Sequence, residues 1–201
     1  MPKSYFDERS YYEERLRDDP ATVFWRSPSG AKQRYDAVLR HIDLSNCSVI
    51  DVGCGRGDFI NHAIAQNIHP MSYCGIDIVP EFIDDAVKRG ISGKFEVGDV
   101  TKSGLGVQSA DWIIAIGLFG HRQPAGLWDE RFEKTTEIMW GACRVGIALT
   151  LTSTASPQRN PEAHYVEPDR ALQAARARFG ECAIVDHSYL PNDFLLIARR
   201  S

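Results

Sequence analysis

The sequence has no run of about 18 consecutive apolar residues, which is the length that a membrane-spanning helix requires. The segment from Met1 to Arg9 has no apolar core of the kind found in a secretory signal peptide. None of the five cysteines belongs to a C-x-x-C pair, so they form no zinc or redox motif of that type. We therefore expect a soluble, cytoplasmic protein with free thiols and no membrane partner.

The chain also lacks an excess of positive charge. It carries 23 Lys and Arg residues against 27 Asp and Glu residues, a net charge of −4, which disfavours attraction to the phosphates of a nucleic acid. With 201 residues it has the length of one domain with its own core. Residues 1–28 are rich in charged and aromatic side chains, and we interpret them as a cap or lid on a main domain formed by residues 29–201.

Strand and helix patterns alternate through the main domain. Strands are expected at 47–52, 72–77, 93–97, 111–116, 145–152, 181–189 and 193–199. Helices are expected between them at 57–66, 80–89, 126–143 and 167–179. Alternating elements require right-handed crossovers, whereas Leu190-Pro191-Asn192 is too short for one and predicts a hairpin. The expected fold class is therefore α/β: a doubly wound, mostly parallel seven-stranded sheet with an antiparallel last strand and helices on both faces.

An acidic residue and three alternate glycines stand at the end of the first expected strand. The segment reads Val49-Ile50-Asp51-Val52-Gly53-Cys54-Gly55-Arg56-Gly57. Glycines let the backbone turn tightly and approach a ligand, and the carboxylate of Asp51 suits a ligand with positive charge. The spacing is G-x-G-x-G, whereas the dinucleotide fingerprint is G-x-G-x-x-G. This segment resembles motif I of the class I S-adenosylmethionine (SAM) methyltransferases, and the succession of elements with its terminal hairpin resembles their seven-stranded sheet.

The resemblance implies SAM as the cofactor and S-adenosylhomocysteine as its product. No metal is expected, because Asp and Asn are not arranged as metal ligands after the fourth expected strand. Residues 29–201 would then be the SAM-dependent methyltransferase domain. In the family, the glycine loop lies beneath the methionine moiety of the cofactor. The residues expected to contact that moiety are Asp51, Gly53, Cys54, Gly55 and Gly57.

Further cofactor-binding residues are expected at the next two strand ends. Asp77 ends the second strand, where a carboxylate can accept both ribose hydroxyls, and Ile78 beside it would pack against the adenine. Asp99 and Val100 follow the third strand, and the resemblance places Asp99 on the adenine amino group. Arg34 is the candidate for meeting the carboxylate of the cofactor, with a solvated helix face as the alternative.

The acceptor would bind beyond the carboxyl ends of the strands. Residues 117–124 contain neither the family signature for methylating DNA amino groups (Asp, Asn or Ser, then Pro-Pro and an aromatic residue) nor the Pro-Cys pair of cytosine-C5 methylation. His121 is the candidate general base in this acceptor site, and the alternative is a surface or cofactor-shelf histidine. The candidate pocket residues are Phe119, Tyr11, Trp25, His164 and Tyr165, although the N-terminal aromatics would equally serve to anchor the cap on the core.

Taken with the resemblance, these residues predict a methyltransferase that moves the SAM methyl group by in-line displacement. The favoured acceptor is an oxygen or nitrogen nucleophile of a small molecule, either a metabolite or a natural product. The alternatives are a protein or RNA methyltransferase, and a SAM-binding regulatory or partner protein without catalysis. An NAD-dependent oxidoreductase is disfavoured by the glycine spacing and by the antiparallel last strand.

Overall fold

The computed structural model describes residues 7–18, 27–124 and 126–200. Seven strands form one sheet in the order β3-β2-β1-β4-β5-β7-β6. They are β1 (Ser48–Val52), β2 (Ser72–Asp77), β3 (Lys94–Val97), β4 (Ala110–Ala115), β5 (Cys143–Thr152), β6 (Ala183–Leu190) and β7 (Asp193–Arg199). β7 is antiparallel to both of its neighbours, while the pairs from β3 to β5 are parallel. The predicted sheet and its terminal hairpin are confirmed.

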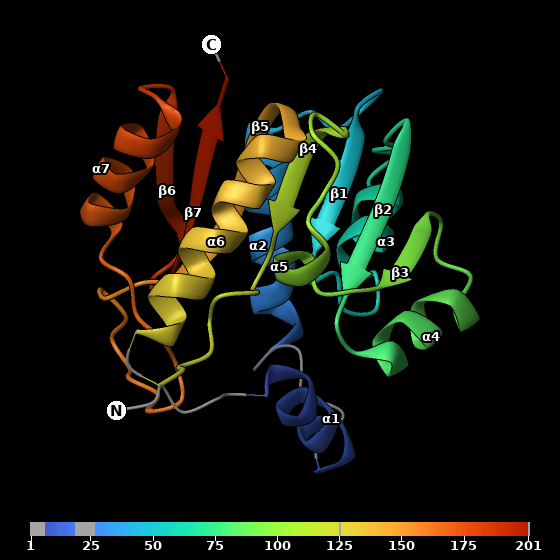
Figure 1. Ribbon diagram of the computed structural model, residues 1–201, viewed down its shortest axis with the longest axis horizontal. Helices are drawn as coiled ribbons and strands as arrows, with labels where there is room; N and C mark the ends of the chain where they lie inside the picture. The colour runs from blue at the N-terminus through green and yellow to red at the C-terminus, as the bar shows by residue number, and fades with distance from the viewer. Residues whose placement is uncertain (1–6, 19–26, 125, 201) are drawn as a thin grey trace.

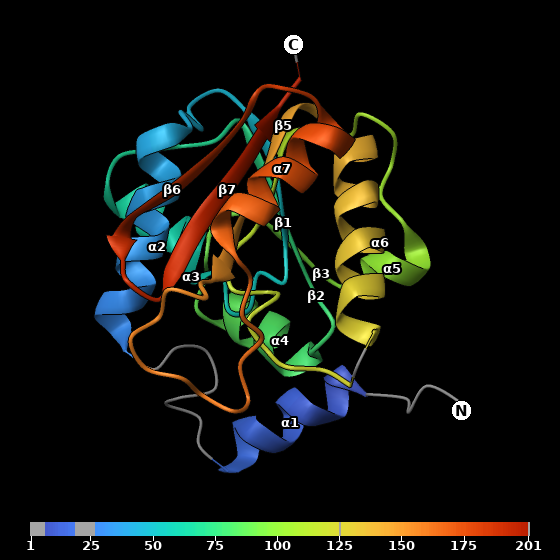
Figure 2. The same ribbon diagram turned by 90° about the vertical axis from the view of Figure 1, so that its left-hand side faces the viewer.

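Helices cover both faces of this sheet (Figures 1 and 2). α2 (Pro28–His41) and α3 (Asp58–Ala65) lie on one face, and α6 (Leu127–Ala142) and α7 (Pro168–Phe179) lie on the other. α4 (Pro80–Lys88) packs against β2 and β3, and the short α5 (Val100–Ser103) contacts α6. α2, α4 and α7 each begin at a proline, where the missing N–H costs no helical hydrogen bond. None of the helices in the described ranges has the length and hydropathy needed to cross a membrane.

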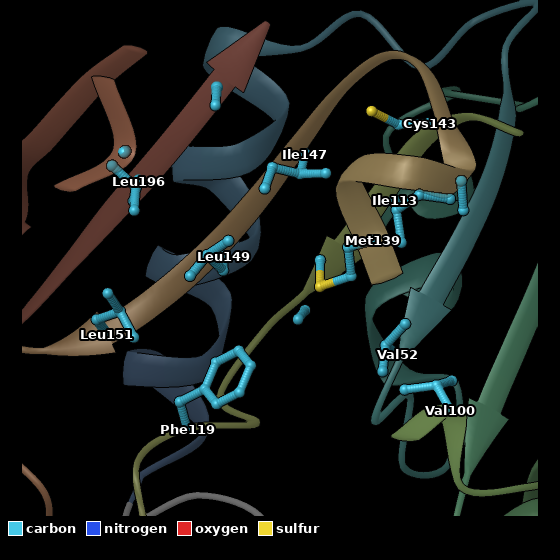
Figure 3. Packing of buried hydrophobic residues seen from close by; sticks show 14 of the residues in the cluster. Val52, Val100, Ile113, Phe119, Met139, Cys143, Ile147, Leu149, Leu151 and Leu196 are labelled. Carbon is cyan, nitrogen blue, oxygen red and sulfur yellow. The ribbon is translucent and has the colours of Figure 1, made fainter. Parts of the chain in front are cut away.

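Two apolar layers hold the helices on the sheet. On one side, Met139 of α6 packs with Ile113 and Ile147 of the central strands (Figure 3). On the other side, Val38 of α2 and Ile60 of α3 belong to a second cluster of buried residues. Because burying such a side chain fully contributes about 1.5–3 kcal/mol, these layers fix the sheet and therefore the positions of the strand ends.

α1 (Glu8–Asp18) lies apart from both layers, beyond the ends to which β1 and β4 point (Figure 1). Its side chains Tyr12 and Leu16 pack against Val79 and Phe82 at the beginning of α4. The described part of the predicted cap is thus a helix that rests on the end of the sheet where the parallel strands finish. Trp25, which was predicted to line the acceptor pocket, lies outside the described residues.

Candidate active site

A cavity of about 730 Å³ opens at the carboxyl ends of the parallel strands. Its walls come from the glycine turn after β1, the ends of β2, β3 and β4, the first half of α6, and α1. The volume lies in the range of pockets that bind cofactors and other small ligands. Among the residues predicted to bind the cofactor, the cavity is lined by Asp51, Gly53, Cys54, Gly55, Asp77, Ile78, Asp99 and Val100.

Asp51 is a buried carboxyl group in the wall of this cavity, with only 2% of its surface exposed. The hydroxyl of Tyr73 donates a hydrogen bond to its Oδ2 at 2.7 Å. Burial raises the pKa of Asp51 to about 7, and the nearby charge of Asp77 acts in the same direction. A cation bound in the cavity would stabilise the ionised form of this group.

The glycine turn brings the backbone against the cavity. Gly53 has φ of +75°, and a Cβ added there would lie 2.8 Å from Cδ1 of Leu118. Gly57 has φ of +72° and precedes α3, but its position faces the ring of Phe95 rather than the cavity. The first glycine therefore leaves room for Leu118 in the cavity wall, whereas the third serves the packing of the turn against β3. Gly57, which was predicted to contact the cofactor, is not among the residues that line the cavity.

Asp77 ties the end of β2 to two neighbouring turns. Its Oδ2 accepts a hydrogen bond from the backbone N–H of Gly55 at 2.9 Å, and its Oδ1 accepts one from Val79 at 3.0 Å. Burial nevertheless raises the pKa of Asp77 above its ordinary value. Because a carboxylate has about four acceptor sites, this fixed side chain retains acceptors for a ligand in the cavity.

Asp99 occupies the N-cap position of α5. Its Oδ1 accepts hydrogen bonds from the backbone N–H of Thr101 at 3.0 Å and from the Thr101 hydroxyl at 2.7 Å, and Nζ of Lys102 lies 3.2 Å from its Oδ2. Burial raises the pKa of Asp99, but these hydrogen bonds outweigh it and leave the pKa below its ordinary value. The group is therefore an ionised acceptor at the cavity wall.

Arg34 does not line the cavity. Its Nη2 forms an ion pair with Oδ2 of Asp193 at 2.9 Å, and its Nη1 donates to the carbonyl of Gly30 at 3.1 Å. Asp193 is itself buried at the start of β7. The ion pair attaches α2 to the sheet, so the structure places Arg34, which was predicted to meet the cofactor, outside the cavity lining. The next residue, Tyr35, does line the cavity.

Phe119 belongs to the apolar core rather than to the pocket. It is 1% exposed and lies in the cluster that includes Leu149 and Leu151 (Figure 3). The ring of Phe132 meets it edge-on, with the centroids 4.9 Å apart. The chain turns at Gly117, with φ of +80°, and Leu118 instead of Phe119 reaches the cavity. The expectation that Phe119 shapes the pocket was wrong for this reason.

The other predicted acceptor residues pack outside the cavity wall. The ring of His121 stacks on Tyr11 of α1, with the centroids 4.0 Å apart, and burial lowers the pKa of His121. His164 stacks on Trp128 at 3.7 Å, and the hydroxyl of Tyr165 accepts a hydrogen bond from the backbone N–H of Asn160 at 2.6 Å. None of the four predicted residues lines the cavity. Their contacts join α1 to the loop after β4 and hold the loop after β5; for Tyr11 such an anchoring role was the alternative interpretation.

Sequence reasoning missed one wall of the cavity, the face of α6. Its lining residues recur at helix spacing and are Leu127, Glu130, Arg131, Lys134 and Thr135. Glu8 of α1 reaches this wall and forms an ion pair with Arg131 at 2.8 Å. The i, i+3, i+4 recurrence of polar residues on a helix that also covers the sheet is the signal that would have found this face.

Comparisons with known proteins agree with this architecture. Residues 43–176 match the family model described as a methyltransferase domain. A ubiquinone biosynthesis O-methyltransferase from Xylella fastidiosa (strain M23) is 32% identical over 108 residues. The match covers 48% of this chain and 42% of the relative. The chain therefore spans less than half the length of that curated relative.

Two solved structures share the fold at lower identity. One is magnesium protoporphyrin IX methyltransferase from Synechocystis PCC 6803 with bound SAH, with a TM-score of 0.70 and 14% identity over 96% of this chain and 98% of that one. The other is the DhpI–SAH complex, with a TM-score of 0.72 and 18% identity over 96% of this chain and 94% of that one. Their similarity extends over nearly the whole chain, so the seven-stranded architecture is shared in full.

Proposed function

The chain belongs to the methyltransferase domain family, and we propose that it is a SAM-dependent methyltransferase that methylates an oxygen or nitrogen nucleophile of a small molecule. The observation that supports a SAM site most directly is the convergence of Asp51, Asp77 and Asp99 on one cavity beside the glycine turn. In such a site, the sulfonium of SAM supplies an activated methyl group.

The residues present fit this cofactor. At Gly53, where the backbone lines the cavity, an added Cβ would collide with Leu118. The buried carboxyl of Asp51 lies in the same wall. We assign the positive end of the cofactor to Asp51, its ribose to Asp77, and its adenine to Asp99 with Ile78 and Val100 at the sides. These assignments follow from the chemistry of each group, since carboxylates accept hydrogen bonds from hydroxyl and amino donors.

The chain's own contribution to catalysis is alignment and exclusion of water. In-line displacement at a methyl carbon requires the nucleophile to approach opposite the leaving sulfur, and positioning alone can lower such a barrier by several kcal/mol. Residues of α1 and of α6 line the cavity together with the strand ends, so a small acceptor inside it would be partly shielded from bulk water. A neutral amine needs no base here, whereas a hydroxyl acceptor must lose its proton.

A small-molecule acceptor is supported by the shape of the site and by the named relatives. α1 lines the cavity on the side away from the sheet. The proteins named above are a ubiquinone biosynthesis O-methyltransferase and a magnesium protoporphyrin IX methyltransferase. A protein or RNA acceptor is the second candidate, but the net charge of −4 disfavours RNA.

The cofactor assignment is tested by thermal unfolding with SAM, S-adenosylhomocysteine and NAD. At about 100 times the Kd, a ligand that binds the native state adds about 2.7 kcal/mol of stability. We expect a shift with both SAM-type ligands and none with NAD. Absence of a shift with either SAM-type ligand would overturn the cofactor assignment.

The acceptor class is tested with SAM that carries an isotope-labelled methyl group. The enzyme is incubated separately with the small-molecule, protein and RNA fractions of a cell extract, and Asp77→Ala serves as the control for enzyme-dependent labelling. Label that appears in small molecules, identified by mass spectrometry, supports the proposal. Label confined to protein or RNA contradicts it.

A further inference from the structure

Glu8, the first residue of α1, reaches from the cap into the cavity. Its Oε2 lies 2.8 Å from Nη2 of Arg131, and the two side chains are only 13% and 20% exposed. One turn further along α1, Tyr12 also lines the cavity and packs against the cluster of Val79 and Phe82, as Ile78 after β2 does. The cap helix therefore presents a carboxylate and a phenol ring to the same part of the cavity.

The second oxygen of this carboxylate has no partner among the residues that the structure describes. Oε1 of Glu8 is buried and accepts no hydrogen bond from any of them. A buried acceptor without a donor costs about 1–3 kcal/mol, and more for a charged group. Such an atom in the wall of a ligand cavity requires a donor from outside the described residues, and a bound ligand can supply one.

The surroundings of Glu8 identify which part of a ligand this donor belongs to. Burial raises the pKa of Glu8 to about 7, Arg131 opposes that shift, and the charges of Asp77 and Asp99 add to it. Glu8 is thus an electrostatic neighbour of the two carboxylates assigned above to the ribose and the adenine. Arg131 balances its charge, so the free oxygen suits a neutral hydroxyl or amino donor better than a cation.

We propose that Glu8 is a further cofactor-binding residue, whose free Oε1 accepts a hydrogen bond from a ribose hydroxyl or the adenine amino group of SAM while Arg131 holds its other oxygen. The proposal rests on SAM as the cofactor and is independent of the acceptor. It gives α1 a direct contact with the adenosine half of the cofactor, in addition to its role as a cover.

The test measures binding without turnover. Dissociation constants for SAM, S-adenosylhomocysteine and 5′-methylthioadenosine, which lacks the amino-acid half, are determined by calorimetry for wild type, Glu8→Gln and Glu8→Ala. We expect Glu8→Ala to weaken all three ligands by the same factor, about 10-fold or more for a charged hydrogen bond. Glu8→Gln keeps an amide oxygen as acceptor and should lose less.

The donor is identified with analogues of 5′-methylthioadenosine that lack one group each: the 2′-hydroxyl, the 3′-hydroxyl or the 6-amino group. For the analogue without the donor, wild type and Glu8→Ala should bind equally, because neither complex contains the hydrogen bond. Glu14→Ala, an exposed acidic residue on the same helix, is the matched control and should bind as wild type does. Unfolding curves without ligand verify that each variant folds.

Two results would overturn the proposal. If the loss in Glu8→Ala persists for all three analogues, Glu8 only fastens α1 to Arg131. If the dissociation constants are unchanged and only the KM of the acceptor rises, Glu8 contacts the acceptor instead. Failure of the wild-type protein to bind SAM at all would contradict the cofactor assignment itself, which separates the two claims.

Discussion

The carboxylate of Asp77 accepts a hydrogen bond from the backbone N–H of Gly55, so the end of β2 and the glycine turn after β1 are joined at 2.9 Å. The same carboxylate accepts from Val79 at the beginning of α4. One buried side chain thus fixes the glycine turn after β1 and the beginning of α4 relative to the end of β2. Its substitution should therefore change both the shape of the unliganded site and its affinity for the cofactor.

We expect Asp77→Ala to weaken SAM binding by about 1.5–3 kcal/mol, the value typical of hydrogen bonds to charged groups. It should also lower the free energy of unfolding without ligand, because the N–H groups of Gly55 and Val79 lose their acceptor. Calorimetry measures the first effect and denaturant unfolding measures the second. Asp84→Ala, an exposed position on α4, is the control and should change neither. Unaltered affinity in a folded Asp77→Ala protein would show that the ribose lies elsewhere.

Gly53→Ala should impair folding and cofactor binding together. The new methyl group meets Cδ1 of Leu118 at 2.8 Å and forces an L residue into φ of +75°. Overpacking typically costs about 1–3 kcal/mol, and a left-handed backbone costs about 1–2 kcal/mol. Gly90→Ala isolates the second cost, because Gly90 has φ of +66° with nothing within 4 Å of the added Cβ.

The double variant Gly53→Ala/Leu118→Ala separates these causes. If the clash with Leu118 matters, the second substitution should recover part of the lost SAM affinity, as measured by titration calorimetry. A Gly53→Ala protein that binds SAM as tightly as wild type would mean that the backbone at Gly53 does not approach the cofactor.

The sheet and the three strand-end acids were predictable because their signals are local. Asp51 and Asp77 stand at the ends of apolar strand patterns, Asp99 follows the next strand after Gly98, and parallel strand ends meet at one edge. The positions of Phe119 and Arg34 could not be predicted because their environment depends on tertiary geometry. One is turned into the core after Gly117, and the other pairs with a residue 159 positions later, at 193 in the chain.

A cap at residues 1–28 was predicted, but the side chains of α1 that reach the cavity were not, for a related reason. The segment Glu8–Asp18 is strongly charged, and its pattern shows no apolar stripe that would face a core. Its position is fixed by a few contacts, such as Tyr12 with Phe82 and Glu8 with Arg131. Only the folded structure places these partners together.

Asp51 should make the unliganded protein less stable as the pH rises from about 4 to about 7. Its pKa is raised to about 7 in the folded state from the ordinary value of 3.8, so the folded state binds a proton that the unfolded state has released. Below about pH 4 both states are protonated, and above about pH 7 both are ionised. Since one pKa unit corresponds to about 1.4 kcal/mol, the loss across this window is at most about 4 kcal/mol.

Asp51→Asn removes the titrating group and keeps an oxygen that can accept from Tyr73. Free energies of unfolding between pH 4 and pH 8 should therefore fall less steeply in this variant than in wild type, while Asp84→Asn should follow the wild-type curve. Parallel curves for wild type and Asp51→Asn would show that Asp51 is ionised in the folded, unliganded protein.

His121→Ala tests whether the predicted base takes part in the reaction. The ring of His121 stacks on Tyr11 outside the cavity wall, so we expect the substitution to loosen α1 and not to remove a proton acceptor. An aromatic pair contributes about 0.5–1.5 kcal/mol, so SAM affinity should fall by no more than that, with kcat and its pH profile unchanged. The measurement requires the acceptor identified by isotope labelling.

A fall in kcat of about 10²–10⁴-fold, the usual contribution of a general base, together with loss of an ionisation from the pH profile, would establish His121 as the base.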